Sequence, residues 1–181
     1  MEEKTTYFDE GGEQNTDEAL RIAASYADAH KINSIVVAST RGFTAEKAAD
    51  IFKCKNLVIV THVHGFREPN VAEFPADLRA KLEADGFKVL TTAHALGGIG
   101  KLVQGSIGDI IANTLRVFSQ GTKVAIECAA EAADAGMIRT DEDVVSVGGT
   151  GRGADTVIVL RPANSHKLFE TKVKRVLAIP G

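Results

Sequence analysis

The feature that most constrains this chain is an apolar strand that leads through a short polar turn into a helix. Residues 35–38 are apolar and mostly β-branched, which is typical of a parallel strand buried on both faces of a sheet. The turn at 39–44 is small and polar. Residues 45–52 then have the apolar spacing of a helix whose N-terminus Thr44 would cap. This succession predicts a layered α/β protein.

The same turn has the features of an anion-binding site. The first amides of a helix have no partner within the helix, and the helix dipole makes its N-terminus positive. Three hydroxyls and a guanidinium in the turn would complete a phosphate cradle, and a glycine would let a ligand approach the backbone. The expected cradle residues are Ser39, Thr40, Arg41, Gly42, Phe43 and Thr44. The alternative is an ordinary turn with a capping threonine, and the turn alone does not decide between the two.

Alternation of apolar segments with helical patterns predicts the topology. After the strand at 35–38, the next three strands are predicted at 57–61, 87–91 and 144–147, and two C-terminal strands follow. Right-handed crossovers then give the first four strands the spatial order 3-2-1-4. We therefore expect a three-layer α/β/α fold with a mainly parallel sheet, formed by a single domain over residues 1–181.

A second candidate loop follows the fourth strand and is the richest glycine segment of the chain. Its candidate ligand-binding residues are Gly148, Gly149, Thr150, Arg152, Gly153, Ala154 and Asp155. Glycines allow backbone amides to approach a ligand, and an arginine can bind phosphate or carboxylate. The alternative is a hairpin turn, because another strand follows at once. In the order 3-2-1-4 this loop and the turn at 39–44 flank the switch point, where ligands bind. Thr61 and His62, beyond the neighbouring strand, would line the floor or side of that crevice.

Composition and charge narrow the classes of function. The net charge of −3 gives no basic footprint for nucleic acid, and no apolar run is long enough to span a membrane. Cys54 and Cys128 show neither metal spacing nor a disulfide framework, so we expect reduced thiols in a cytoplasmic protein. His62 and His64 lack further ligands at a matching spacing, so no metal site is predicted. Glu127, in an alanine-rich helix, is expected to face solvent rather than a ligand.

The turn also resembles a known phosphate-binding loop. Residues 39–45 read Ser-Thr-Arg-Gly-Phe-Thr-Ala and resemble the effector-phosphate loop Thr-x-Ser-Gly-Arg-Ser-Ala in the C-terminal domain of pyruvate kinase. Over nearly its whole length, the chain is similar to the stand-alone archaeal family named for that domain. The matching pieces are residues 36–39, 148–149, 152–156 and 161–163. The catalytic barrel of pyruvate kinase has no counterpart here, so the resemblance does not imply kinase activity.

The resemblance implies a pyruvate kinase C-terminal-domain-like fold and flavin mononucleotide (FMN) as the bound cofactor. The FMN phosphate would lie at the turn 39–44 and the flavin in the crevice beside loop 148–155. A phosphorylated small molecule is thus the expected partner, and a homo-oligomer the expected state. Two alternatives stay open, namely a flavin-dependent oxidoreductase and a sensor or binding module for another phosphorylated metabolite. The sequence does not assign catalytic residues.

Overall fold

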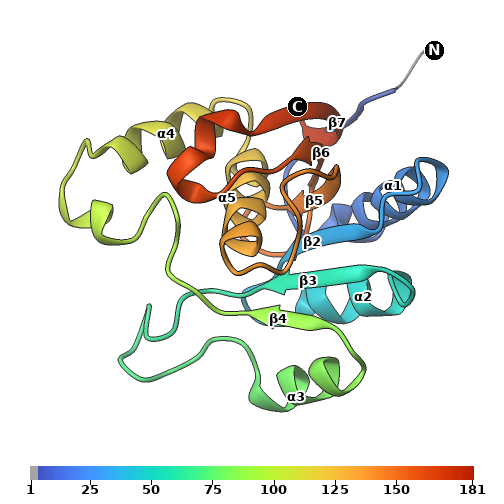
Figure 1. Cartoon of the computed structure of the whole chain (residues 1–181), viewed down its shortest axis with the longest axis horizontal. Coiled ribbons are helices and arrows are strands. Elements are labelled where there is room, and N and C mark those ends of the chain that lie inside the picture. Colours follow the sequence, from blue (N-terminus) through green and yellow to red (C-terminus); the bar gives the residue numbers. More distant parts are fainter. Residues whose placement is uncertain (1–3) are drawn as a thin grey trace.

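The computed structural model describes residues 4–181 and contains one seven-stranded sheet (Figure 1). Its strands are β1 (Thr6–Phe8), β2 (Ser34–Ala38), β3 (Asn56–Val60), β4 (Lys88–Leu90), β5 (Val144–Gly148), β6 (Thr156–Arg161) and β7 (Lys172–Pro180). They lie in the spatial order β1-β7-β6-β5-β2-β3-β4. Only β6 runs against its neighbours, since it pairs antiparallel with both β5 and β7 while the other pairings in the sheet are parallel.

The α/β class with a mainly parallel sheet is confirmed, but the predicted strand order was incomplete. The four strands used for the prediction are β2, β3, β4 and β5, and they are neighbours in the sequence β4-β3-β2-β5 within the larger sheet. The sheet continues through β6 and β7 to β1, a strand that was not predicted from the sequence. With three residues and a largely exposed Tyr7, β1 is too short to carry a recognisable alternation.

Helices cover both faces of the sheet, which gives the three layers (Figure 1). One face is covered by α1 (Thr16–Ala29), α2 (Phe43–Ile51) and α3 (Ala76–Ala84). The other face is covered by α5 (Gln120–Asp134), against which α4 (Ile107–Arg116) packs. Short 3-10 turns occur at η1 (Glu13–Asn15), η2 (Ile99–Leu102) and η3 (Ser165–Glu170). Among residues 4–181, no helix combines the length and the apolar character needed to cross a membrane.

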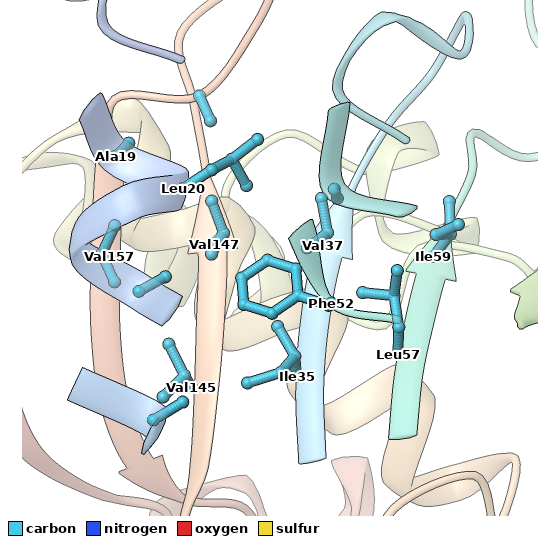
Figure 2. Close-up of a cluster of buried hydrophobic side chains, with 14 of the residues drawn as sticks. Ala19, Leu20, Ile35, Val37, Phe52, Leu57, Ile59, Val145, Val147 and Val157 are labelled. Carbon is cyan, nitrogen blue, oxygen red and sulfur yellow. The ribbon is translucent and has the colours of Figure 1, made fainter. Parts of the chain in front are cut away.

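The central strands are apolar on both faces because each face has its own core. Alternate residues of β2 point to opposite sides, so Ile35 and Val37 belong to the core under α1 and α2 while Val36 belongs to the core under α5. Figure 2 shows the ring of Phe52, just after α2, among the side chains of Ile35, Val37 and Leu57. This two-sided burial explains the continuous β-branched runs in the sequence.

The start of α2 differs from the sequence expectation. Thr44 does not cap α2, because the helix begins at Phe43, two residues before the predicted start, and its N-cap is Gly42, which has a left-handed backbone with φ of 93°. Gly121 lies in the first turn of α5, which begins at Gln120. Ser119 caps α5 by accepting a hydrogen bond from the Thr122 amide at 2.9 Å.

We predict that Phe52→Ala destabilises the protein far more than Ile51→Ala. Phe52 is 1% exposed and its removal would leave a cavity in the core, whereas the adjacent Ile51 is 42% exposed. Core Phe→Ala changes cost about 3–5 kcal/mol, and exposed substitutions usually cost less than about 1 kcal/mol. Urea unfolding of both variants measures the difference. Equal losses would contradict this account of the core.

Candidate functional site

A cleft of about 620 Å³ opens at the carboxyl ends of β2, β3 and β5. This is the switch point of the sheet, because the chain leaves β2 toward β3 on one side and returns to β5 on the other. The two loops singled out in the sequence lie on this cleft. The sequence-predicted residues that line it are Ser39, Thr40, Arg41, Phe43, Thr44, Thr61, His62, Gly149, Arg152 and Gly153.

The N-terminus of α2 forms one edge of the cleft. The Ser39 hydroxyl accepts a hydrogen bond from the Ala45 amide at 3.1 Å, which takes over the capping role expected of Thr44. Within residues 4–181, no hydrogen-bond acceptor is found for the amides of Phe43 and Thr44. Both residues line the cleft. Unpaired first-turn amides and the helix dipole make this edge suitable for an anion.

Cationic side chains surround this edge, and each has a carboxylate nearby. Arg152 approaches Glu13 at 2.8 Å, and its guanidinium lies 4.6 Å from the centre of the Phe43 ring. Arg41 and Arg67 approach the carboxylate of Glu73 at 3.4 and 3.5 Å. Both arginines are largely exposed, while Glu73 is about nine-tenths buried. Arg41 and Arg67 are therefore held beside the cleft without short bonds to Glu73.

Five of the predicted residues do not line the cleft. They are Gly42, Gly148, Thr150, Ala154 and Asp155. Asp155 is fully buried and accepts hydrogen bonds from the amides of Gly12 and Thr150 at 2.9 Å and from the Thr156 hydroxyl at 2.8 Å. The Ala154 amide donates to the Thr16 hydroxyl at 3.0 Å. These contacts tie loop 148–155 to the start of α1, so this part of the loop serves the fold.

Two of the glycines are required by close packing. A Cβ on Gly148 would lie 2.3 Å from the carbonyl oxygen of Gly121, so this position lets β5 approach the first turn of α5. A Cβ on Gly42 would lie 2.4 Å from the Leu78 side chain on α3, in addition to the strain of its left-handed backbone. The glycine signal in the sequence therefore had a structural cause at these two positions.

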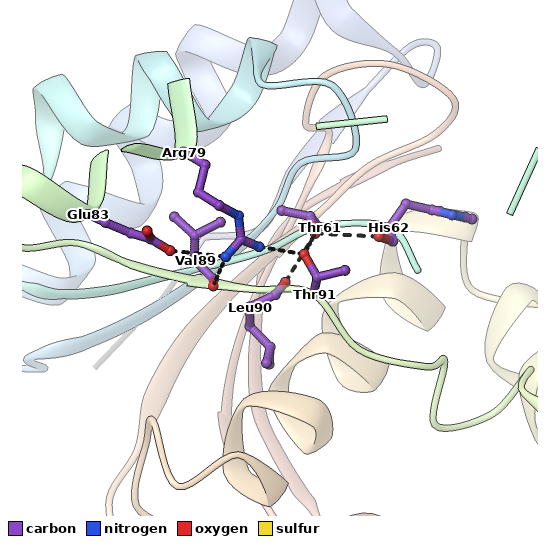
Figure 3. Close-up of polar contacts among 7 residues, drawn as sticks. All are labelled: Thr61, His62, Arg79, Glu83, Val89, Leu90 and Thr91. Carbon is purple, nitrogen blue, oxygen red and sulfur yellow. Dashed lines mark hydrogen bonds and ion pairs between the residues drawn. The ribbon is translucent and has the colours of Figure 1, made fainter. Parts of the chain in front are cut away.

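Thr61 and His62 follow β3 and form the side of the cleft. The Thr61 hydroxyl lies 2.6 Å from that of Thr91 and 3.2 Å from the carbonyl oxygen of Leu90, and Arg79 donates to Thr91 at 2.5 Å (Figure 3). This network joins the ends of β3 and β4 to α3. The ring of His62 lies 4.5 Å from that of His94, which comes from the loop after β4 and also lines the cleft.

The wall formed by α5 was missed by the sequence analysis. Lys123, Glu127 and Glu131 follow one another at four-residue spacing and line the cleft, yet they are 7%, 4% and 5% exposed. Lys123 forms an ion pair with Glu127. The amides of Leu96 and Ala95 donate to Glu127 and Glu131, each at 2.9 Å. The expectation that Glu127 faces solvent was therefore wrong. The spacing of three charges in an alanine-rich helix was the available signal.

Burial changes the ionisation of two groups on this wall. Desolvation raises the pKa of Glu131 from 4.5 to about 8; the hydrogen bond from Ala95 opposes the rise, and the charge of Glu127 adds to it. Burial, together with Glu131 and Glu127, also raises the pKa of the Cys128 thiol well above its usual value, which makes this cysteine a poor nucleophile. Within the described part of the chain, no group of three or more His, Cys, Asp or Glu side chains is placed to hold a metal ion.

Fold and cleft together define an α/β domain whose switch-point cleft has an edge suited to an anion. The sequence pattern of the family described as the pyruvate kinase alpha/beta domain matches residues 17–160. The chain belongs to this family.

A solved pyruvate kinase from Cryptosporidium parvum is similar to this chain at 12% sequence identity, with a TM-score of 0.41. The match covers 79% of this chain and 22% of the pyruvate kinase, so the chain corresponds to about a fifth of that protein.

We predict that Glu131→Gln changes how stability depends on pH. The folded state holds a proton on Glu131 up to about pH 8, while the unfolded chain releases it near the ordinary value of 4.5. Because the folded state binds more protons in this window, wild-type stability falls as the pH rises through it. The variant lacks this loss. Its free energy of unfolding, relative to that of wild type, should therefore rise by a few kcal/mol between about pH 4.5 and about pH 8.

Chemical denaturation at a series of pH values measures this difference. Glu142→Gln, at an exposed carboxylate, is the matched control and should follow wild type. A constant difference between Glu131→Gln and wild type across the pH range would show that Glu131 ionises normally in the folded protein.

Proposed function

We propose that this cleft binds FMN, with its phosphate at the N-terminus of α2. The observation that carries the proposal is the pair of amides at Phe43 and Thr44, which lack acceptors among residues 4–181 and lie at the edge of the cleft. A phosphate oxygen would accept from both amides and would gain from the helix dipole. The resemblance of residues 39–45 to the effector-phosphate loop of pyruvate kinase supports the same placement.

Side chains around this edge suit a phosphate monoester. Ser39 accepts from the Ala45 amide, so its own hydroxyl hydrogen remains available to a phosphate oxygen. Arg41 lies in the same turn, lines the cleft and is held only loosely by Glu73 at 3.4 Å. A phosphate could therefore gain a charge-assisted bond from Arg41 without a short ion pair being broken.

The rest of the cleft suits the ribityl chain and the flavin. Its volume of about 620 Å³ lies within the range of about 300–1,000 Å³ that is usual for small-molecule pockets. Ala38, Val60 and Val124 supply apolar surface, and Gly149, with neighbouring glycines, supplies backbone that a ligand can approach. Bound FMN would supply the capacity for hydride and electron transfer, while the protein would supply binding and orientation.

A flavin-dependent oxidoreductase is the second candidate function. The contact between His62 and His94 on the cleft favours it, because imidazoles can move protons near neutral pH. Mixing the FMN complex with NADH or NADPH and following the flavin absorbance separates the two functions. Fast bleaching that is lost in His62→Ala would establish the oxidoreductase, whereas slow bleaching without dependence on His62 favours a binding module.

We predict that Arg41→Ala and Thr44→Val each weaken FMN binding about ten- to a hundredfold. Loss of one hydrogen bond to a charged group costs roughly 1.5–3 kcal/mol, which corresponds to this change in Kd. Calorimetric titration with FMN measures it. Arg139→Ala is the matched control, because Arg139 is similarly exposed but precedes β5, at the opposite end of the sheet.

The control should keep wild-type affinity. Unchanged affinity in both test variants would place the phosphate elsewhere. A colourless preparation that fails to bind added FMN would reject the cofactor, and binding of a different phosphate ester in its place would favour the sensor or binding module.

A further inference from the structure

The proposed phosphate site uses one edge of the cleft and leaves the α5 wall without a role. This wall presents two carboxylates and one ammonium, from Glu127, Glu131 and Lys123, and each of these side chains is more than nine-tenths buried. Burying charges is costly unless they are paired and hydrogen-bonded.

Within the described residues 4–181, no cation forms an ion pair with Glu131. Lys123 pairs with Glu127, four residues away, so these two side chains carry no net charge together. Glu131 has one oxygen fixed by the Ala95 amide at 2.9 Å, and no further hydrogen bond to its carboxyl is found in the described part of the chain. A second buried negative charge beside Glu127 would be repelled by it. The arrangement therefore favours a proton on Glu131, which makes the carboxyl a hydrogen-bond donor.

Among residues 4–181, no other cation is in contact with Glu131. On α5, the titratable groups around it are Lys123, Glu127, Cys128 and Asp134, which together carry more negative than positive charge when ionised. From the loop after β4, His94 lines the same cleft and also the smaller adjoining pocket. From η3, Ser165 lines that smaller pocket and donates through its amide to Asp134.

We propose that Glu131 donates a hydrogen bond from its neutral carboxyl to an acceptor atom in the uncharged part of the ligand. The cleft would then contact its ligand at two places. The N-terminus of α2 would bind the phosphate, and Glu131 on α5 would bind a carbonyl oxygen or ring nitrogen. This rests on the proposed function and deepens it, because it defines the ligand class as phosphate monoesters whose other end is neutral and carries acceptors. The flavin ring, with its carbonyl oxygens and ring nitrogens, meets this requirement.

The proposal is tested by the pH dependence of FMN affinity. Only the protonated form of Glu131 can donate, and with a pKa of about 8 the protonated fraction falls about tenfold from about pH 7 to about pH 9. Wild type should therefore lose about tenfold in FMN affinity between these two pH values, measured by calorimetry. The phosphate is already doubly ionised at both, since its second pKa is about 6.

Glu131→Gln makes the test specific. The amide keeps a neutral donor and an acceptor for Ala95 but does not titrate, so its FMN affinity should stay constant over the same range. Glu142→Gln should keep the wild-type fall. Any change in the ionisation of FMN itself would affect all three proteins alike.

The outcomes separate this proposal from the one on which it rests. FMN binding without a fall in wild type, or an equal fall in Glu131→Gln, would overturn the role of Glu131 and leave the phosphate site standing. No FMN binding at either pH would overturn the proposed function, and the role of Glu131 with it.

Discussion

The parallel pairing of β2 with β5 is the interaction on which the cleft depends. Val36 lies opposite Ser146 in this pairing, and the two strands end side by side at Ala38 and Gly148. Their pairing brings together two loops that are more than a hundred residues apart in the sequence. The contact is maintained by burial on both faces and by the close approach of β5 to α5 at Gly121. Each loop has the composition of a ligand site, but only their juxtaposition creates a cleft.

The cleft has two chemically different walls because different layers of the fold supply them. On one side, the turn after β2 provides helix-terminal amides together with exposed arginines. On the other side, α5 provides buried ionisable side chains, of which Glu127 and Glu131 accept hydrogen bonds from the amides of Leu96 and Ala95. Buried ionic groups are a weak source of stability, since apolar residues of similar size often do as well. Their position on the cleft wall is the basis for the proposed role of Glu131 in recognising a ligand.

Strands and their order could be predicted from the sequence because they depend on local or periodic patterns. Helix caps and buried charged residues could not, because they depend on how distant elements pack. The runs of β-branched residues gave the central strands, and crossover handedness gave the relative order of β4, β3, β2 and β5. Thr44 was misread as a cap because the close packing of Gly42 on α3 is not visible in the sequence. Asp155 was read as a ligand residue because its partner at Gly12 is distant in the chain. Glu127 was expected to face solvent, and Glu131 was not identified, because a charged residue in a helix usually faces water.

The central claim is that a phosphate binds the first turn of α2 within this cleft. Titration of isotope-labelled protein with FMN, followed through backbone amide resonances, tests it most directly. The account predicts that the largest shifts fall on the amides of Phe43 and Thr44 and spread to Ser39 and the amides of loop 149–153. Shifts centred on another element, with the amides of Phe43 and Thr44 unmoved at saturating FMN, would contradict it.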